Sequence, residues 1–176
     1  ATVRVALDNR VALDTVAAAA AMAQREIGVL IEFDSVKRRQ GVRAPDEALA
    51  LARHVQDAAY LRFRGLMTYP SSPESAAWIA RARRAFDDAG IAIETVSGGG
   101  TPAMWAAHEI EGLTEYRAGT YVYHDRKTVA AGVATLEDCA LHVHATVVAA
   151  PSEDRVVIDA GSKSLTSDPV PPDVGE

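Results

Sequence analysis

The chain has 176 residues, 48% hydrophobic and 24% charged, which is enough apolar material for one globular domain, or for one domain and a fragment of another. Its formal net charge of -6 argues against a nucleic-acid surface, because phosphate backbones select clustered Lys and Arg. The single Cys139 excludes an internal disulfide, and no apolar run approaches the roughly 20 residues that span a bilayer. We therefore expect a small-molecule partner, no nucleic acid, no membrane and a reducing, cytoplasmic setting.

Strand-like and helix-like patterns alternate from the start of the chain. Apolar alternation predicts a strand over 3–7, and the Ala-rich stretch 11–25 predicts a well-packed helix. Residues 28–33 form an apolar run of strand length. Pro45 then opens a helix that extends to about residue 55, with two acidic residues in its first turn, where the helix dipole favours acid. These are two βα units.

The middle of the chain continues the alternation. Residues 63–69 predict a third strand, and Ser72-Pro73 combines an N-cap with Pro at the first helical position of a helix that ends at Gly90. A fourth strand is expected over 91–96. A short helix follows from Thr101, and a fifth strand is expected over 116–123.

The pattern changes in the last quarter of the chain. Two strands, 140–149 and 155–158, flank the turn-forming tetrapeptide 151–154, so we expect an antiparallel hairpin without helices. The Pro-rich, acidic segment 168–176 is typical of a loop. The sequence therefore predicts an α/β region of parallel strands, as a doubly wound sheet or part of a barrel, followed by a β-rich region.

A glycine triplet lies between the fourth strand and the short helix. Backbone without Cβ can curl its N–H groups around an anion, and the start of a helix adds a favourable dipole. Hydroxyl side chains flank the triplet and could donate to phosphate oxygens, although a flexible loop without a ligand explains the glycines equally well. The predicted anion-binding loop consists of Ser97, Gly98, Gly99, Gly100 and Thr101.

Three further motifs are collinear with this loop. Residues 32–42 resemble the Asp-x-Gly-x-x-Arg-x-Gly strand end of alanine racemase and D-threonine aldolase relatives, with Val36 at the usual glycine. Residues 64–69 resemble their Gly-Leu-Met strand, and residues 115–121 their Arg-Pro-Gly strand. The tail 157–165 is most similar to the D-threonine aldolase and D-serine dehydratase branch. The chain thus resembles the alanine-racemase-like, fold type III pyridoxal-phosphate enzymes over nearly its whole length.

This resemblance implies a fold and a domain division. Residues 1–128 would be the C-terminal half of an alanine-racemase-like (β/α)8 TIM-type barrel that binds pyridoxal 5'-phosphate, and residues 129–176 would be part of a β-rich second domain. The lysine that holds the cofactor as an imine belongs to the first barrel strand of the family, and this chain is expected to lack it. A divalent metal, manganese or zinc, is expected in the parent protein with its ligands outside this chain.

The resemblance also implies roles for individual residues. The Ser97 loop, with the backbone of Gly119 and Thr120, would hold the cofactor phosphate, and Arg117 would face the pyridine nitrogen. Arg39 would lie beside the phenolic oxygen or the substrate carboxylate, and Tyr69 against the ring; a surface ion pair and a rim aromatic are the alternatives. The expected catalytic residues are Arg39 and Tyr69, and the expected cofactor-binding residues are Ser97, Gly98, Gly99, Gly100, Thr101, Arg117, Gly119, Thr120 and Tyr121.

The activity that the resemblance implies is that of a pyridoxal-phosphate-dependent lyase acting on D-amino acids. The leading forms are a D-threonine aldolase, which cleaves D-3-hydroxy amino acids, and a D-serine dehydratase, each expected as a homodimer. An amino acid racemase, a non-catalytic pyridoxal-phosphate-binding module and a phosphosugar-binding barrel enzyme are the alternatives.

Two histidines provide a separate metal hypothesis. His142 and His144 are two residues apart on an expected strand and would share one face, as zinc ligands can. No third ligand accompanies them in the sequence pattern, so an exposed strand face is the preferred interpretation.

Overall fold

The computed structural model describes residues 3–34 and 38–165, and the chain divides into two compact units, Ala1–Ala118 and Gly119–Glu176. We describe each unit separately, as unit 1 and unit 2. The motif position Val36 and the expected loop 168–176 lie outside the described residues.

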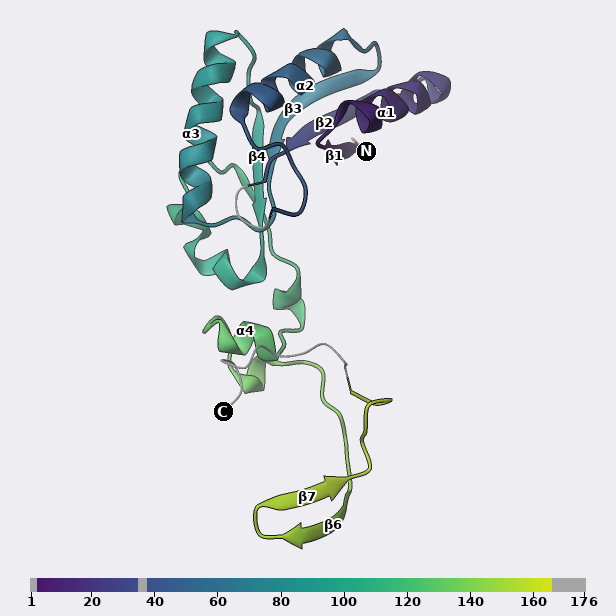
Figure 1. Ribbon diagram of the computed structural model, residues 1–176, viewed down its shortest axis with the longest axis vertical. Coiled ribbons are helices and arrows are strands. Elements are labelled where there is room, and N and C mark those ends of the chain that lie inside the picture. The colour runs from purple at the N-terminus through teal and green to yellow at the C-terminus, as the bar shows by residue number, and fades with distance from the viewer. Residues whose placement is uncertain (1–2, 35–37, 166–176) are drawn as a thin grey trace. The chain divides into compact units, whose positions relative to one another are not determined.

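Unit 1 is a five-stranded parallel sheet with strands in sequence order, β1 to β5. Three α-helices and a 3-10 helix, η1, connect the strands, and Figure 1 shows the helices on one side of the sheet. The α/β class is therefore confirmed. The elements are β1 Arg4–Leu7, α1 Arg10–Ala23, β2 Ile27–Glu32, α2 Pro45–Asp57, β3 Leu61–Met67, α3 Pro73–Asp88, β4 Thr95–Gly99, η1 Thr101–Glu109 and β5 Glu115–Arg117.

The helices begin where local chemistry favours a start. The side chain of Asn9 accepts a hydrogen bond from the amide of Ala12 and caps α1. Pro45 and Pro73 occupy the first turns of α2 and α3, and Ser72 forms a capping box with Ser75. The predicted starts of α2 and α3 are thus confirmed.

The apolar core lies between the sheet and its helices. Central strand residues such as Val29 and Ile31 are fully buried against it. At the end of β2, the ring of Phe33 stacks on that of Trp78 from α3, with centroids 4.0 Å apart and planes 2° from parallel. Trp78 also donates its indole N–H to the carbonyl of Arg43, 3.0 Å away. This cluster fixes the chain that leaves β2 against α3.

The opposite face of the sheet carries charged side chains at the amino ends of the strands. Arg4 of β1 donates to the hydroxyl of Thr95 in β4, 3.1 Å away, and its guanidinium lies 4.0 Å from the carboxylate of Glu115 in β5. Because β2 and β3 separate β1 from β4, a side chain can make this contact only across a concave surface. The five strands are therefore curved like an arc of a barrel, and the arc is open among the described residues.

Gly65 of β3 pairs with Thr95 of β4 at close range. Its φ is +142°, and a Cβ added there would lie 1.9 Å from the carbonyl oxygen of Thr95. The register of β2 against β3 shifts between Val29 and Leu30, beside this point. Only glycine fits this position.

In unit 1, the fourth and fifth strands differ most from the predicted extent. The fourth strand begins at Thr95, not at residue 91, because the chain after α3 turns back: the amide of Ile91 donates to the carbonyl of Phe86, 2.9 Å away. The apolar character of Ile91 reflects packing on the core. The fifth strand ends at Arg117, and a 3-10 helix covers Thr120–Val122.

Unit 2 contains the 3-10 helix η2 (Thr120–Val122), the helix α4 (Arg126–Ala130), the 3-10 helix η3 (Leu136–Asp138) and a hairpin of β6 (Val147–Ser152) with β7 (Arg155–Ile158). The predicted hairpin is confirmed, but its first strand begins at Val147. His142 and His144 precede it outside any strand, so the expected strand face was wrong. Within the described residues, no group of three His, Cys, Asp or Glu side chains is arranged to hold a metal.

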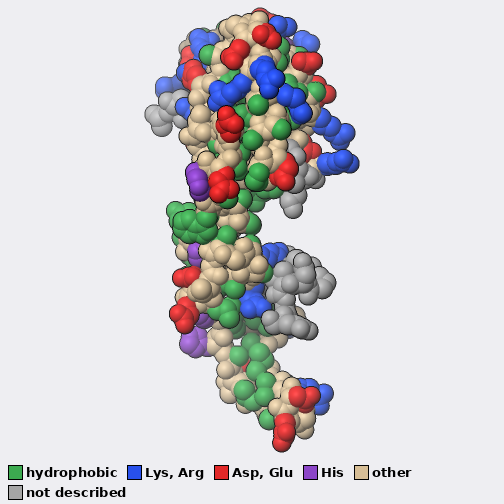
Figure 2. Space-filling view, turned by 90° about the vertical axis from the view of Figure 1, so that its left-hand side faces the viewer, with side chains coloured by type: hydrophobic (Ala, Val, Ile, Leu, Met, Phe, Trp, Pro, Cys, Tyr) green, Lys and Arg blue, Asp and Glu red, His purple; other side chains and the backbone are tan. Residues whose placement is uncertain are grey.

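Acidic and basic side chains intermingle on the surface of unit 1 that Figure 2 presents. Among the helices in the described part of the chain, none combines the length and the hydropathy needed to cross a bilayer.

Candidate functional site

The candidate site lies at the carboxyl ends of the strands of unit 1, where parallel α/β barrels carry their active sites. Arg39 follows β2, Tyr69 follows β3, Ser97 lies in β4 and Arg117 ends β5. The residues expected from the sequence thus come from four neighbouring strands of one sheet.

Several hydrogen bonds fix the glycine loop. The hydroxyl of Ser71 accepts from the amide of Gly99 at 3.0 Å, and the amide of Ser71 donates to the carbonyl of Gly99 at 2.9 Å. Tyr116 donates its hydroxyl to the carbonyl of Gly100 at 2.6 Å, and the amide of Gly100 donates to the carbonyl of Arg117 at 3.2 Å. The loop is therefore hydrogen-bonded both to the segment that follows β3 and to β5.

Packing within the protein accounts for two of the three glycines. A Cβ on Gly98 would lie 2.8 Å from the Leu113 side chain and 2.8 Å from the Ser71 hydroxyl. A Cβ on Gly99 would lie 2.9 Å from the carbonyl oxygen of Arg117. Gly100 is different: its φ of +123° is a conformation that L side chains rarely adopt, and it directs the chain into η1.

Thr101 supplies the observation that points to a ligand. Its side chain is 4% exposed, and its Oγ1 is a buried atom without a hydrogen-bond partner. In the described residues, His124 Nδ1, in unit 2, is the other such atom. Buried hydroxyls are normally hydrogen-bonded, so an orphaned one beside a glycine turn fits an oxyanion such as a phosphate.

Arg117 is anchored across the sheet. Its Nε donates to the hydroxyl of Ser97 at 2.8 Å, and its Nη2 donates to the carbonyl oxygen of Thr68 at 2.8 Å. Ser97 and Thr68 are both fully buried. The guanidinium therefore has a fixed position over Gly99, where a Cβ would lie 3.4 Å from its Cζ.

Arg39 and Tyr69, which the sequence predicts to share one site, lie close together. The Cζ of Arg39 lies 5.5 Å from the centroid of the Tyr69 ring, a cation–π distance, and Tyr69 is 45% exposed. A Cβ on Gly100 would lie 3.9 Å from Cε2 of Tyr69. The chain segments after β2, β3 and β4 thus converge on one aromatic ring.

Gly119, Thr120 and Tyr121 belong to unit 2, in and beside η2. Tyr121 is exposed. Their expected role at the cofactor phosphate stays a prediction.

Sequence patterns did not reveal the residues that support the site. Gln40 donates to both carboxylate oxygens of the buried Glu32 at 2.8 Å, and the carboxylate of Asp8 accepts from the amide of Gly41 at 2.9 Å. These contacts hold the segment that carries Arg39. Ser71 and Tyr116 support the glycine loop. Ser71 stands in a Ser-Ser-Pro sequence that signals a helix cap, and nothing local points to its contact with Gly99.

Burial raises the pKa of Tyr116, which keeps its hydroxyl a neutral donor to Gly100. A group with a raised folded pKa stabilises the fold fully below its unfolded pKa, here 10.0, and that contribution is lost as pH rises through the folded pKa.

Tyr116→Phe should lower the free energy of unfolding by about 1 kcal/mol at neutral pH, the usual value of one hydrogen bond. Urea unfolding at increasing pH should show this difference shrinking above about pH 10, where the Tyr116 hydroxyl of the unfolded chain begins to ionise before that of the folded protein. Tyr60→Phe is the control, because Tyr60 directly precedes β3 and so lies at the amino ends of the strands, away from the candidate site. A Tyr116→Phe deficit that persists unchanged in strong alkali would contradict the assignment.

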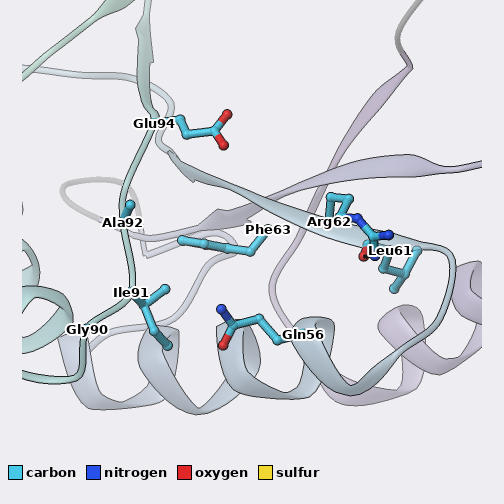
Figure 3. A pocket seen from close by; sticks show the side chains of 8 residues that line it. All are labelled: Gln56, Leu61, Arg62, Phe63, Gly90, Ile91, Ala92 and Glu94. Atoms are coloured by element: carbon cyan, nitrogen blue, oxygen red, sulfur yellow. Dashed lines mark hydrogen bonds between the residues drawn. The ribbon is translucent and has the colours of Figure 1, made fainter.

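A cavity of about 420 Å3 lies at the amino ends of the strands. Figure 3 shows Gln56 on α2 and Ile91 pointing toward the space beside Phe63, with Glu94 above them. Arg62, also in its lining, already pairs with Glu26 at 3.0 Å. This cavity lies at the opposite end of the strands from the candidate site.

Comparison with known families identifies the chain's relationship. A family model described as the alanine racemase N-terminal domain matches residues 1–127, more than half of the chain. The chain belongs to this family. A second model, the putative serine dehydratase domain, matches residues 140–176. The relationship to alanine racemase and D-serine dehydratase expected from the motifs is confirmed.

Curated relatives of this alanine racemase family member include lyases. D-threo-3-hydroxyaspartate dehydratase of Delftia sp. (strain HT23) is 36% identical over 92% of this chain and 48% of that protein. D-threonine aldolase of Arthrobacter sp. is 34% identical over 98% of this chain and 50% of that protein. The chain spans about half the length of these relatives.

Solved structures similar to this chain include enzymes with the same names as these relatives. The D-threonine aldolase of Filomicrobium marinum has a TM-score of 0.72 and 28% identity, over 94% of this chain and 50% of that one. The Delftia dehydratase has a TM-score of 0.74 and 32% identity, over 94% of this chain and 48% of that one. The α/β fold expected from the motifs is therefore that of known alanine-racemase-like proteins.

Proposed function

We propose that this chain supplies the phosphate-binding and ring-binding half of a pyridoxal-phosphate barrel, in a lyase acting on D-3-hydroxy amino acids. The D-threonine aldolase and D-serine or hydroxyaspartate dehydratase reactions are the leading forms, in keeping with the names of the relatives. The observation that carries the proposal is the orphaned hydroxyl of Thr101 beside Gly100.

The described residues suit the two ends of such a cofactor. Thr101 would donate to the phosphate, with the backbone of Gly100 shaping the turn. Gly119, Thr120 and Tyr121 keep the phosphate-binding role that the resemblance implies, as a prediction. Arg117 would face the ring nitrogen. It has no acceptor atom, so it would hold that nitrogen unprotonated. Tyr69 would lie against the ring, and Arg39 beside the phenolic oxygen or the substrate carboxylate.

When bound, the cofactor supplies an electron sink for negative charge on the substrate α-carbon. The residues of this chain bind and orient. Arg39, in the segment that Gln40 and Gly41 anchor, would offer a cation to a carboxylate. Tyr69, close to Arg39 and Gly100, limits the position of a planar group between them.

A divalent metal, manganese or zinc, belongs to this proposal for the whole protein, with ligands outside this chain. One similar solved structure is a D-threo-3-hydroxyaspartate dehydratase variant in a metal-free form. A homodimer and a cytoplasmic location complete the proposal. Light scattering on the purified full-length protein would check the dimer.

The test uses the full-length protein. We expect it to bind pyridoxal phosphate with a visible absorption band, and to consume D-threonine, D-serine or D-threo-3-hydroxyaspartate but not their L-enantiomers. Product analysis separates the reactions, because aldol cleavage of D-threonine releases glycine and dehydration of D-serine releases pyruvate and ammonia. Chelator treatment and manganese or zinc addition test the metal.

Other outcomes identify the alternatives. Interconversion of D- and L-amino acids would indicate a racemase, and a stable cofactor band without turnover would indicate a binding module. Failure to bind pyridoxal phosphate, with binding of a sugar phosphate, would overturn the proposal in favour of a phosphosugar enzyme.

A further inference from the structure

Arg117 is held by two hydrogen bonds that use one edge of its guanidinium. Nε donates to Ser97 Oγ and Nη2 donates to the carbonyl oxygen of Thr68, each at 2.8 Å. Both acceptors come from other strands or strand ends, Ser97 from β4 and Thr68 from the residue after β3. This leaves the Nη1 end of the group for a ligand.

Fixing an arginine side chain in one rotamer costs conformational entropy, and these two hydrogen bonds offset that cost before a ligand binds. Arg117 is an exposed residue, and a free arginine side chain would sample many rotamers. Hydrogen bonds at two nitrogens fix both the position and the plane of the guanidinium. Gly99 adds a steric condition, because a Cβ there would lie 3.4 Å from the Arg117 side chain and 2.9 Å from its carbonyl oxygen.

Ser97 therefore has a contact that its expected place in the phosphate loop does not explain. Its hydroxyl is fully buried and accepts from Arg117. Thr101, four residues later, has the hydroxyl without a partner. The two hydroxyls that flank the glycine triplet thus differ: that of Ser97 accepts a hydrogen bond from Arg117, whereas that of Thr101 can bind a ligand.

We infer that Ser97 is a positioning residue for Arg117, and that it acts on the ring-nitrogen end of the cofactor and not on its phosphate. Ser97 and the Thr68 carbonyl hold the Arg117 guanidinium in the orientation in which it can donate to the ring nitrogen, while Thr101 donates to the phosphate. This inference rests on the proposed function, because it assigns Arg117 to the ring nitrogen of pyridoxal phosphate.

The experiment compares two ligands in the full-length protein: pyridoxal phosphate, and its analogue in which the ring nitrogen is replaced by C–H. Ser97→Ala should weaken pyridoxal phosphate about tenfold, the effect of one charge-assisted hydrogen bond. Its affinity for the analogue should stay within about twofold of wild type, because the analogue offers Arg117 no acceptor. Ser97→Thr, which keeps a hydroxyl, should restore binding of pyridoxal phosphate.

Two further variants test whether Ser97 affects binding through Arg117 and whether Thr101 contacts the phosphate. Thr101→Val should weaken both ligands equally, since both carry the phosphate. Ser97→Ala combined with Arg117→Gln should bind pyridoxal phosphate as weakly as Arg117→Gln alone, because a residue that acts through Arg117 has no effect without it. Thermal unfolding of each variant monitors folding.

Three results would overturn the inference. If Ser97→Ala weakened both ligands equally, Ser97 would act on the phosphate, which both ligands share. If the losses in the double variant were additive, the effect of Ser97 would not depend on Arg117. Unchanged binding of both ligands would leave Ser97 without a role in positioning. A wild-type protein that binds neither ligand would instead remove the proposed function, and the inference with it.

Discussion

Gly65→Ala should destabilise the protein more than any other single substitution considered for this chain. The added Cβ would lie 1.9 Å from the carbonyl oxygen of Thr95 and 2.8 Å from its carbonyl carbon, both backbone atoms of β4. The φ of +142° adds strain for any L side chain. Because a backbone cannot move aside as a flexible side chain does, β3 and β4 must separate, and we expect a loss of more than about 4 kcal/mol.

Urea unfolding and soluble yield would measure this effect, with Gly90→Ala as the matched control. Gly90 also has a positive φ, +69°, but a Cβ there meets no atom within 4 Å. The control isolates backbone strain, for which we expect a loss of about 1–2 kcal/mol. Equal losses for the two variants would show that strain, and not the contact between β3 and β4, governs position 65.

Thr101→Val should have the largest effect on the proposed cofactor site. The substitution keeps the shape of the side chain and removes the hydroxyl, which is buried without a partner. The apoprotein should therefore be as stable as wild type or more stable, because an unsatisfied polar group is removed from the interior. Binding of pyridoxal phosphate should weaken about 10- to 100-fold, as expected for a lost hydrogen bond to an anion.

Thermal unfolding with and without pyridoxal phosphate, together with direct titration, would check both halves of this prediction. Pyridoxal without its phosphate is the control ligand, and its affinity should be the same for wild type and Thr101→Val. A less stable apoprotein would indicate that the hydroxyl serves the fold. Equal weakening of both ligands would place Thr101 away from the phosphate.

Local signals were sufficient to predict much of the fold. Pro45, Ser72 and Pro73 act within one turn of the helices that they start, so the sequence around them contains the whole physical cause. The alternation of apolar runs with helical stretches predicted that the five strands are parallel and follow one another along the chain with helices between them, but it left their order in the sheet open. The motifs also indicated which strand ends meet, and Arg39 beside Tyr69 is the clearest case.

Effects that depend on distant residues could not be predicted in this way. Gly98 and Gly99 were interpreted through an anion, yet Leu113 and Arg117 require them to be small. Residues 91–94 have the composition of a strand, but a hydrogen bond to Phe86 turns them toward α3. The polarity of the loop residues likewise does not distinguish the partnered hydroxyl of Ser97 from the unpartnered one of Thr101.

The reach of Arg4 across the concave face has a consequence for the order of folding. Its hydrogen bond to Thr95 joins residues 91 positions apart, whereas β1 and β2 pair across a short helical connection. Closing so long a stretch of chain is entropically unfavourable until the intervening strands are in place. The contact therefore belongs to the late stage of folding, and its loss should chiefly accelerate unfolding and leave the folding rate nearly unchanged.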